Sequence, residues 1–134
     1  MSGINDLATL LSQLQPICDK HDYVFCCSPR NELPDGFVPK ATFREAEGLT
    51  IVCLQSDAEK AGLDYEAIFS CITLSVHSSL QAVGLTAAVS KVLADNGISA
   101  NVIAAYYHDH IFVPKQDTEH AIQLLGSLST IPIS

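Results

Sequence analysis

The chain has 134 residues, of which 48% are hydrophobic and only 16% are charged. This composition is sufficient for one ordinary domain, or for two very small units that share a core, and it excludes a disordered chain. Fifteen acidic and seven basic residues leave a formal net charge of −8 without any cluster of Lys or Arg, so nucleic acid and anionic membranes are poor partners.

The cysteines and the N-terminus indicate a cytoplasmic protein. The five cysteines are odd in number, lack C-x-x-C spacing and are expected to be reduced core residues: Cys18, Cys26, Cys27, Cys53 and Cys71. The N-terminus has no basic segment followed by a long apolar stretch, and no run approaches 18 apolar residues. Because so few residues are charged, we expect another copy of the chain to cover apolar surface in a homodimer or higher homo-oligomer.

The first half of the chain predicts two helices and three strands. Helical spacing is shown by four leucines, Leu7, Leu10, Leu11 and Leu14, and Pro16 is expected to end this helix. A short strand over 22–27 precedes a Pro-rich loop, and residues 40–54 predict two strands joined at Glu47-Gly48. Residues 56–62 predict a short helix with a capping box from Ser56 to Glu59 and Gly62 as its end.

The second half begins with residues 67–76, which are apolar on both faces and predict a central strand. A helix over 83–97 follows, with one apolar face and Gly97 just past its end: Leu85, Ala88, Val89, Val92 and Leu93. Strands are expected over 100–107 and 110–114, with a two-residue turn at His108-Asp109. Residues 117–128 predict the closing helix, with Asp117 as its cap.

Two offsets suggest that the halves are repeats. Shifting the sequence by 60 places residues 51–61 over 111–121, with Ile, Asp, Glu and Ala coinciding. Shifting it by 78 places the first helix over 85–92 and residues 23–27 over 101–105. The offsets differ by 18, which an insertion covering the Pro-rich region in the first copy explains.

The repeated order of helices and strands predicts an α+β fold of two ferredoxin-like βαββαβ units, each an antiparallel sheet with helices on one face. The first unit is expected over residues 1–64, with the insertion at about 28–46, and the second over 65–134. Because the chain is short for two complete units, they are expected to share or exchange strands. The C-terminal "TIPIS", 130–134, or a strand of the insertion would supply the missing edge.

The stretch "LSVHSSLQAVGLTAAVSKVLADNGISANVI", residues 74–103, resembles the ACT domain, a regulatory module that binds small molecules. Gly84-Leu85 at the helix start and Gly97-Ile98 before the next strand match the pairs of that family. The stretch through "AYYHDHIFVP" is similar to small bacterial proteins that contain two tandem ACT-like domains. The resemblance implies ACT-type units for both halves.

The resemblance also implies a non-enzymatic regulatory module that binds a small metabolite, expected to be an amino acid, at an interface between ACT units. The implied ligand contacts are His77, Ser78, Ser79, Val83, Gly84, Leu85, Ile98, Ser99 and Asn101. Physical chemistry also favours the helix start, because Gly84 permits close approach and free N–H groups can hold a carboxylate. No cofactor, metal or catalytic residue is assigned.

Three alternatives remain open. Ser78 or Ser79 can simply cap the helix while Gly84 packs against the sheet. A metal-dependent hydrolase or metal-binding protein would be centred on His108, Asp109 and His110, although the other histidines have no ligand spacing. A structural interaction module without a ligand is the third alternative.

Overall fold

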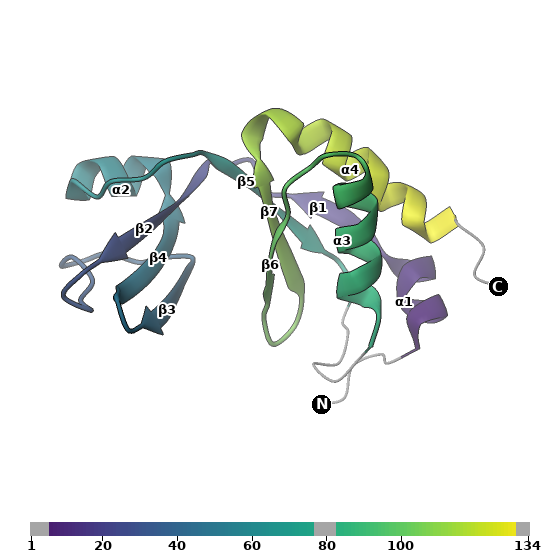
Figure 1. Cartoon of the computed structure of the whole chain (residues 1–134), viewed down its shortest axis with the longest axis horizontal. Helices are drawn as coiled ribbons and strands as arrows, with labels where there is room; N and C mark the ends of the chain where they lie inside the picture. Colours follow the sequence, from purple (N-terminus) through teal and green to yellow (C-terminus); the bar gives the residue numbers. More distant parts are fainter. Residues whose placement is uncertain (1–5, 77–82, 131–134) are drawn as a thin grey trace. The chain divides into compact units, whose positions relative to one another are not determined.

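The computed structural model describes residues 6–76 and 83–130, which form two compact units. One unit, called here the composite unit, combines the segment that ends at Lys20 with the segment that begins at Ser70. The other, the central unit, comprises His21–Phe69. The N-terminal segment therefore packs with residues of the second half of the chain (Figure 1). The boundary between two family units at residues 64 and 65 stays a prediction.

In the described residues, the sheet of the composite unit has four strands. Strand β1 (Pro16–Cys18) pairs antiparallel with β5 (Phe69–Leu74), and β7 (Asp109–Pro114) lies between β5 and β6 (Asn101–Ala104). Cys71, Ile72 and Leu74 of β5 are almost fully buried. The apolar run was therefore correctly interpreted as a central strand, although the strand is shorter than the predicted 67–76.

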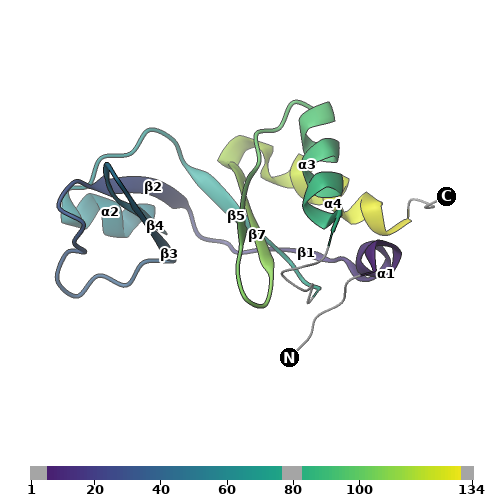
Figure 2. The same cartoon turned by 60° about the horizontal axis from the view of Figure 1, so that its bottom comes forward.

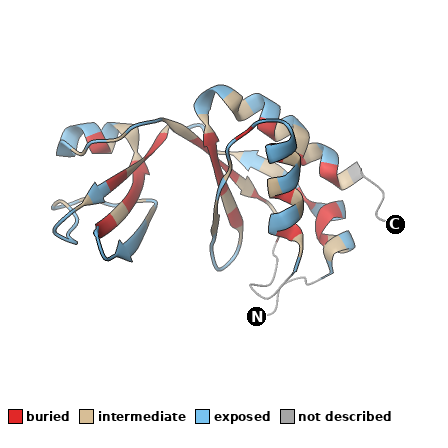
Figure 3. Ribbon diagram, viewed as in Figure 1, coloured by how far each residue is buried: buried red, intermediate tan, exposed pale blue. Residues whose placement is uncertain are grey.

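Three helices cover one face of this sheet: α1 (Leu7–Gln13), α3 (Leu85–Asp95) and α4 (Thr118–Ser127). The 3₁₀ turns η1 (Lys115–Asp117) and η2 (Leu128–Thr130) flank α4. Each helix contributes leucines at helical spacing to a core that also contains Ile111 and Val113 of β7 (Figure 3). Burial of these apolar faces is the main force that holds the helices on the sheet.

The central unit has three antiparallel strands in the order β3-β4-β2 and one helix. These are β2 (Tyr23–Ser28), β3 (Ala41–Glu45), β4 (Gly48–Leu54) and α2 (Gln55–Ala61). Phe69 at the start of β5 pairs with Tyr23 on the far side of β2. Between Ser28 and Ala41 the chain has neither helix nor strand, and its Phe37 packs against the small core around Val24 and Ile51.

The strand register repeats with the predicted offset of 60. Thr42 lies opposite Ile51 in the β3–β4 hairpin, and Val102 lies opposite Ile111 in the β6–β7 hairpin. Each hairpin leads into a helix, α2 or α4. The antiparallel α+β class with two ferredoxin-like units is confirmed, and the register shows which segments correspond.

The second predicted offset, of 78, was wrong for the strands. It placed β2 over β6, but β2 lies between β4 and the start of β5, whereas β6 pairs only with β7 among the described strands. Among the described strands, β1, which begins at Pro16, supplies an edge of the composite unit, and no strand of the insertion does. Pro16 is therefore the first residue of an edge strand, where its missing N–H is tolerated. Residues 131–134 of "TIPIS" lie outside the described residues.

Some local predictions were confirmed and others were wrong. Gly62 and Gly97 adopt left-handed conformations just after α2 and α3, as predicted. The capping box of α2 was wrong, since Leu54 is the N-cap and no side chain caps the helix. Cys26, Cys53 and Cys71 are buried, while Cys27 is exposed. Among the described residues, no helix is long and apolar enough to cross a membrane.

Candidate functional site

The start of α3 is the first element of the predicted ligand site. Gly84 is its N-cap residue, with a φ of 104°, and no side chain caps the helix. The first intrahelical bond runs from the Ala88 N–H to the Gly84 carbonyl at 2.9 Å. Among the residues that the structure describes, no side chain accepts a hydrogen bond from the N–H groups of the first turn, which carry the positive end of the helix dipole.

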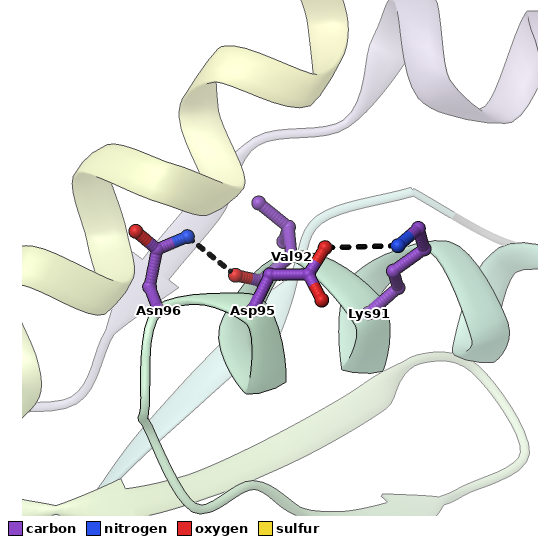
Figure 4. Close-up of polar contacts among 4 residues, drawn as sticks. All are labelled: Lys91, Val92, Asp95 and Asn96. Carbon is purple, nitrogen blue, oxygen red and sulfur yellow. Dashed lines mark hydrogen bonds and ion pairs between the residues drawn. The ribbon is translucent and has the colours of Figure 1, made fainter.

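The other end of α3 is closed by the chain itself. The Asn96 side chain donates a hydrogen bond to the Val92 carbonyl at 2.8 Å, and the Lys91 ammonium lies 2.9 Å from the Asp95 carboxylate (Figure 4). The Ile98 N–H also donates to the carbonyl of Leu93. Within the described residues the two ends of the helix thus differ, because a polar side chain bonds the backbone at the end of α3 and none does so at its start.

Gly84 is required by its surroundings as well as by its φ. A Cβ atom at this position would lie 3.0 Å from Cδ2 of Leu7 in α1. Leu7 belongs to the apolar residues packed around the core of the composite unit. The backbone at the start of α3 is therefore in close contact with α1.

Asp109 is a buried acid at the first position of β7. It is 9% exposed and lies opposite Ala104 in the β6–β7 ladder. Because side chains alternate along a strand, Asp109 points to the same face as Ile111, the face that the helices cover. Burial raises the pKa of its carboxyl group, and the neighbouring His110 and His108 partly oppose this.

Asp109 and the start of α3 lie at the same end of the composite unit. The Thr73 hydroxyl near the end of β5 lies 2.9 Å from Nδ1 of His110 near the start of β7, so these two strand ends meet. Figures 1 and 2 both show the β6–β7 hairpin loop and the first turn of α3 at this end. The start of α3 and the buried carboxylate of Asp109 therefore lie at the same end of the composite unit.

The structure separates the two halves of the predicted contact set. Gly84 lies before α3 and Ile98 after it, and eleven helical residues span about 16 Å. Ile98 is buried, and the exposed Asn101 donates a side-chain hydrogen bond to the Phe112 carbonyl at 3.3 Å. One amino acid is too small to touch both ends of α3, so Ile98, Ser99 and Asn101 do not join Gly84 within this unit.

The other predicted contacts are placed as follows. Val83 is 82% exposed, whereas Leu85 is buried in the core of the composite unit. Val83 is thus accessible to a ligand, and Leu85 offers its backbone N–H rather than its side chain. The predicted contacts His77, Ser78 and Ser79 lie outside the described residues.

The histidine and aspartate segment is not the turn that the sequence predicted. The hairpin loop comprises residues 105–108 and is closed by the Ala105 N–H, which donates to the His108 carbonyl. Asp109 and His110 follow in the strand and point to opposite faces. Within the described part of the chain, no three His, Cys, Asp or Glu residues lie close enough to hold a metal ion.

The sequence-based prediction missed the burial of Asp109 because it placed this residue in a turn. The alternation in "DHIFV" could have predicted this burial. If the strand begins at Asp109, then Asp109, Ile111 and Val113 lie on one face of it. An acid in register with core positions is unusual, because a buried carboxylate is costly unless a partner compensates it.

Comparisons with known proteins agree with this architecture. A family model described as an ACT domain matches residues 2–70, and a second model, also described as an ACT domain, matches residues 66–127. The comparison with curated proteins gave no match. The two family matches follow each other along the chain and together include every described helix except the last 3₁₀ turn.

Solved structures share the fold. A protein of unknown function from Vibrio cholerae, described as a possible transport protein, has 51% identity and a TM-score of 0.81, covering 96% of this chain and 99% of that one. A protein from Agrobacterium tumefaciens has 23% identity and a TM-score of 0.70, with 87% and 90% coverage. The regulatory subunit of aspartate kinase from Thermus flavus has 8% identity and a TM-score of 0.65, with 85% and 96% coverage.

Proposed function

Because the chain belongs to the ACT-domain family, with two matches in tandem, we propose that it is a non-enzymatic regulatory module that binds an amino acid at the start of α3. The observation that carries this proposal is the position of two complementary groups at one end of the composite unit. The uncapped start of α3 offers N–H groups, and Asp109 offers a buried carboxylate.

The chemistry of the two groups fits a zwitterion. An α-carboxylate accepts hydrogen bonds from the free N–H groups at a helix start and is favoured by the helix dipole. An ammonium group beside Asp109 would compensate the carboxylate that burial disfavours. Val83, directly before Gly84, is exposed and can contact the side chain of a bound amino acid.

The regulatory mechanism is a shift of population. A ligand at the start of α3 would favour one conformation of the composite unit, in which the positions of α3, α1 and the β6–β7 hairpin relative to one another are fixed. The coupling free energy of such systems is about 1–3 kcal/mol. In this proposal the regulated protein is a separate cytoplasmic chain.

Assembly would bring in the remaining predicted contacts. Ile98, Ser99 and Asn101 lie at the far end of α3 from Gly84, so in this proposal they contact a ligand held by another copy of the chain. A homodimer or higher homo-oligomer is therefore part of the proposal. Its oligomeric state is measured directly by light scattering with and without the ligand.

A thermal-shift screen of the twenty amino acids tests the proposal. A ligand present at about a hundred times its dissociation constant adds roughly 2.7 kcal/mol to the free energy of unfolding. We expect at least one amino acid to raise the melting temperature in a concentration-dependent manner. If none of the twenty changes it, the protein is an interaction module without an amino-acid ligand and the proposal is wrong.

A further inference from the structure

The central unit contains a pocket that is separate from the start of α3. It has a volume of about 360 Å³ and lies between the Pro-rich segment and helix α2. Its walls include Pro34, Asp35 and Phe37 from the segment and Asp57, Lys60 and Ala61 from the helix. Every one of these residues belongs to His21–Phe69, so the pocket is formed by one unit alone.

The pocket exists because this unit has a loop where the composite unit has α3. The loop folds into a turn in which the Phe37 N–H donates to the Pro34 carbonyl at 3.1 Å. Phe37 is half-buried and packs against the core that contains Ile51 and Ala58. The aromatic ring thus fixes the loop to the unit, and the space beside α2 is left for a small molecule.

The pocket carries both signs of charge. Lys60 is exposed and lies three residues after Asp57 on α2, yet no ion pair between them is present. In the part of the chain that the structure describes, Asp35, Asp57 and Lys60 form no side-chain hydrogen bond or salt bridge. The lysine on α3 behaves differently, because Lys91 is paired with Asp95 at 2.9 Å.

We propose that this pocket binds a second small zwitterion, an amino acid with an apolar side chain. Its carboxylate would pair with the Lys60 ammonium, and its ammonium would pair with Asp35 or Asp57. Its side chain would lie against Phe37, Pro34 and Ala61. The lining thus combines apolar residues with three charged side chains, and small-molecule sites of this volume are commonly built from both kinds of residue. This second site does not depend on the site at the start of α3, since the two share no residue.

An NMR titration of the full-length ¹⁵N-labelled protein with L-leucine tests the second site. We expect saturable shifts of the Gly36, Phe37 and Ala61 amides. Lys60→Gln should weaken this binding about tenfold or more, because it removes one charge-assisted hydrogen bond. Lys91→Gln, which removes an exposed lysine from α3, is the matched control and should leave the binding unchanged.

Two analogues of leucine test the need for both charges. 4-Methylpentanoate lacks the ammonium group and 3-methylbutylamine lacks the carboxylate, and each should bind at least about tenfold more weakly than L-leucine. The second site is disproved if the three pocket amides do not shift, if Lys60→Gln binds like the wild type, or if either analogue binds as tightly as leucine. Amides of Gly84 and Asp109 report on the first site in the same spectra, so failure of one site is distinguished from failure of the other.

Discussion

Asp109 lies opposite Ala104 in the last residue pair before the β6–β7 hairpin loop. This pairing makes Asp109 a strand residue that shares a face with the core, rather than a turn residue exposed to water. Its position decides the chemistry of the site, because a carboxylate that is 9% exposed is disfavoured in its charged form until a cation approaches.

Asp109→Asn is expected to stabilise the protein without ligand at pH 7. Burial raises the pKa of the Asp109 carboxyl group above its usual value of 3.8, so its ionised form destabilises the folded state. This loss of folding free energy is absent below pH 3.8. It grows as the pH rises from 3.8 to the raised pKa of the folded state and is complete above that pKa. The difference in stability between Asp109→Asn and the wild type should therefore be largest near neutral pH and shrink toward pH 4, as urea unfolding at several pH values measures.

The exposed Asp64 provides the control for that experiment. Asp64→Asn removes an exposed carboxylate, and its effect on stability should be small. A loss of stability in Asp109→Asn at pH 7 would mean that the folded protein already stabilises this carboxylate, and the proposed role in binding an ammonium group would be lost.

Gly84→Ala is expected to destabilise the composite unit. Alanine at a φ of 104° is strained, and its Cβ would lie 3.0 Å from the flexible Leu7 side chain. We expect a loss of about 1–3 kcal/mol in the free energy of unfolding. The matched control is Gly126→Ala in α4, where no atom lies within 4 Å of the added Cβ and alanine should stabilise the helix by about 0.5–1 kcal/mol.

Gly48→Ala is expected to be more damaging than Gly84→Ala. Gly48 begins β4 with a φ of 151°, and a Cβ there would lie 2.6 Å from the Ser28 carbonyl oxygen, which is backbone and cannot swing away. The strand pair β2–β4 must separate or the turn must rearrange. Urea unfolding should show a loss of more than about 2 kcal/mol. Equal effects of the two substitutions would contradict the contact at Ser28.

Leu10→Ala tests whether the N-terminal helix belongs to the composite unit. Leu10 is 0% exposed and packs in the core that includes Leu93 and Leu125. Truncation should cost about 2–5 kcal/mol, and hydrogen exchange should accelerate in β5, α3 and α4. Ser12→Ala on the exposed face of α1 is the control. Faster exchange confined to β2 and β4 would contradict the assignment of α1 to this unit.

The periodic parts of the fold were predictable from the sequence. Apolar spacing identified α1, α3 and α4, and the glycines at 62 and 97 marked helix ends, because these signals depend on residues close together in the chain. The offset of 60 was correct because equivalent hairpins and helices place the same residue types on the same faces. Family resemblance added the ACT type, which the matches to both halves confirm.

Long-range pairings were not predictable in the same way. Nothing near Pro16 shows that residues 16–18 pair with β5, since the partner residues Ile72 and Leu74 are more than fifty positions away. The register of the β6–β7 hairpin was also missed, and a shift of the turn by two residues removed Asp109 from the core face. Gly84 was therefore among the predicted ligand contacts, whereas Asp109 was placed in a turn and not among them.

An NMR titration of ¹⁵N-labelled protein with the amino acid that gives the largest thermal shift tests binding at the start of α3 most directly. We predict saturable shifts of the Gly84, Leu85 and Asp109 amides in the wild type, and binding at least about tenfold weaker in Asp109→Asn because a charge-assisted hydrogen bond is lost. A ligand site at this end of the composite unit would be contradicted if the ligand left the signals of these three amides unchanged. Equal affinities of the wild type and Asp109→Asn would also contradict it.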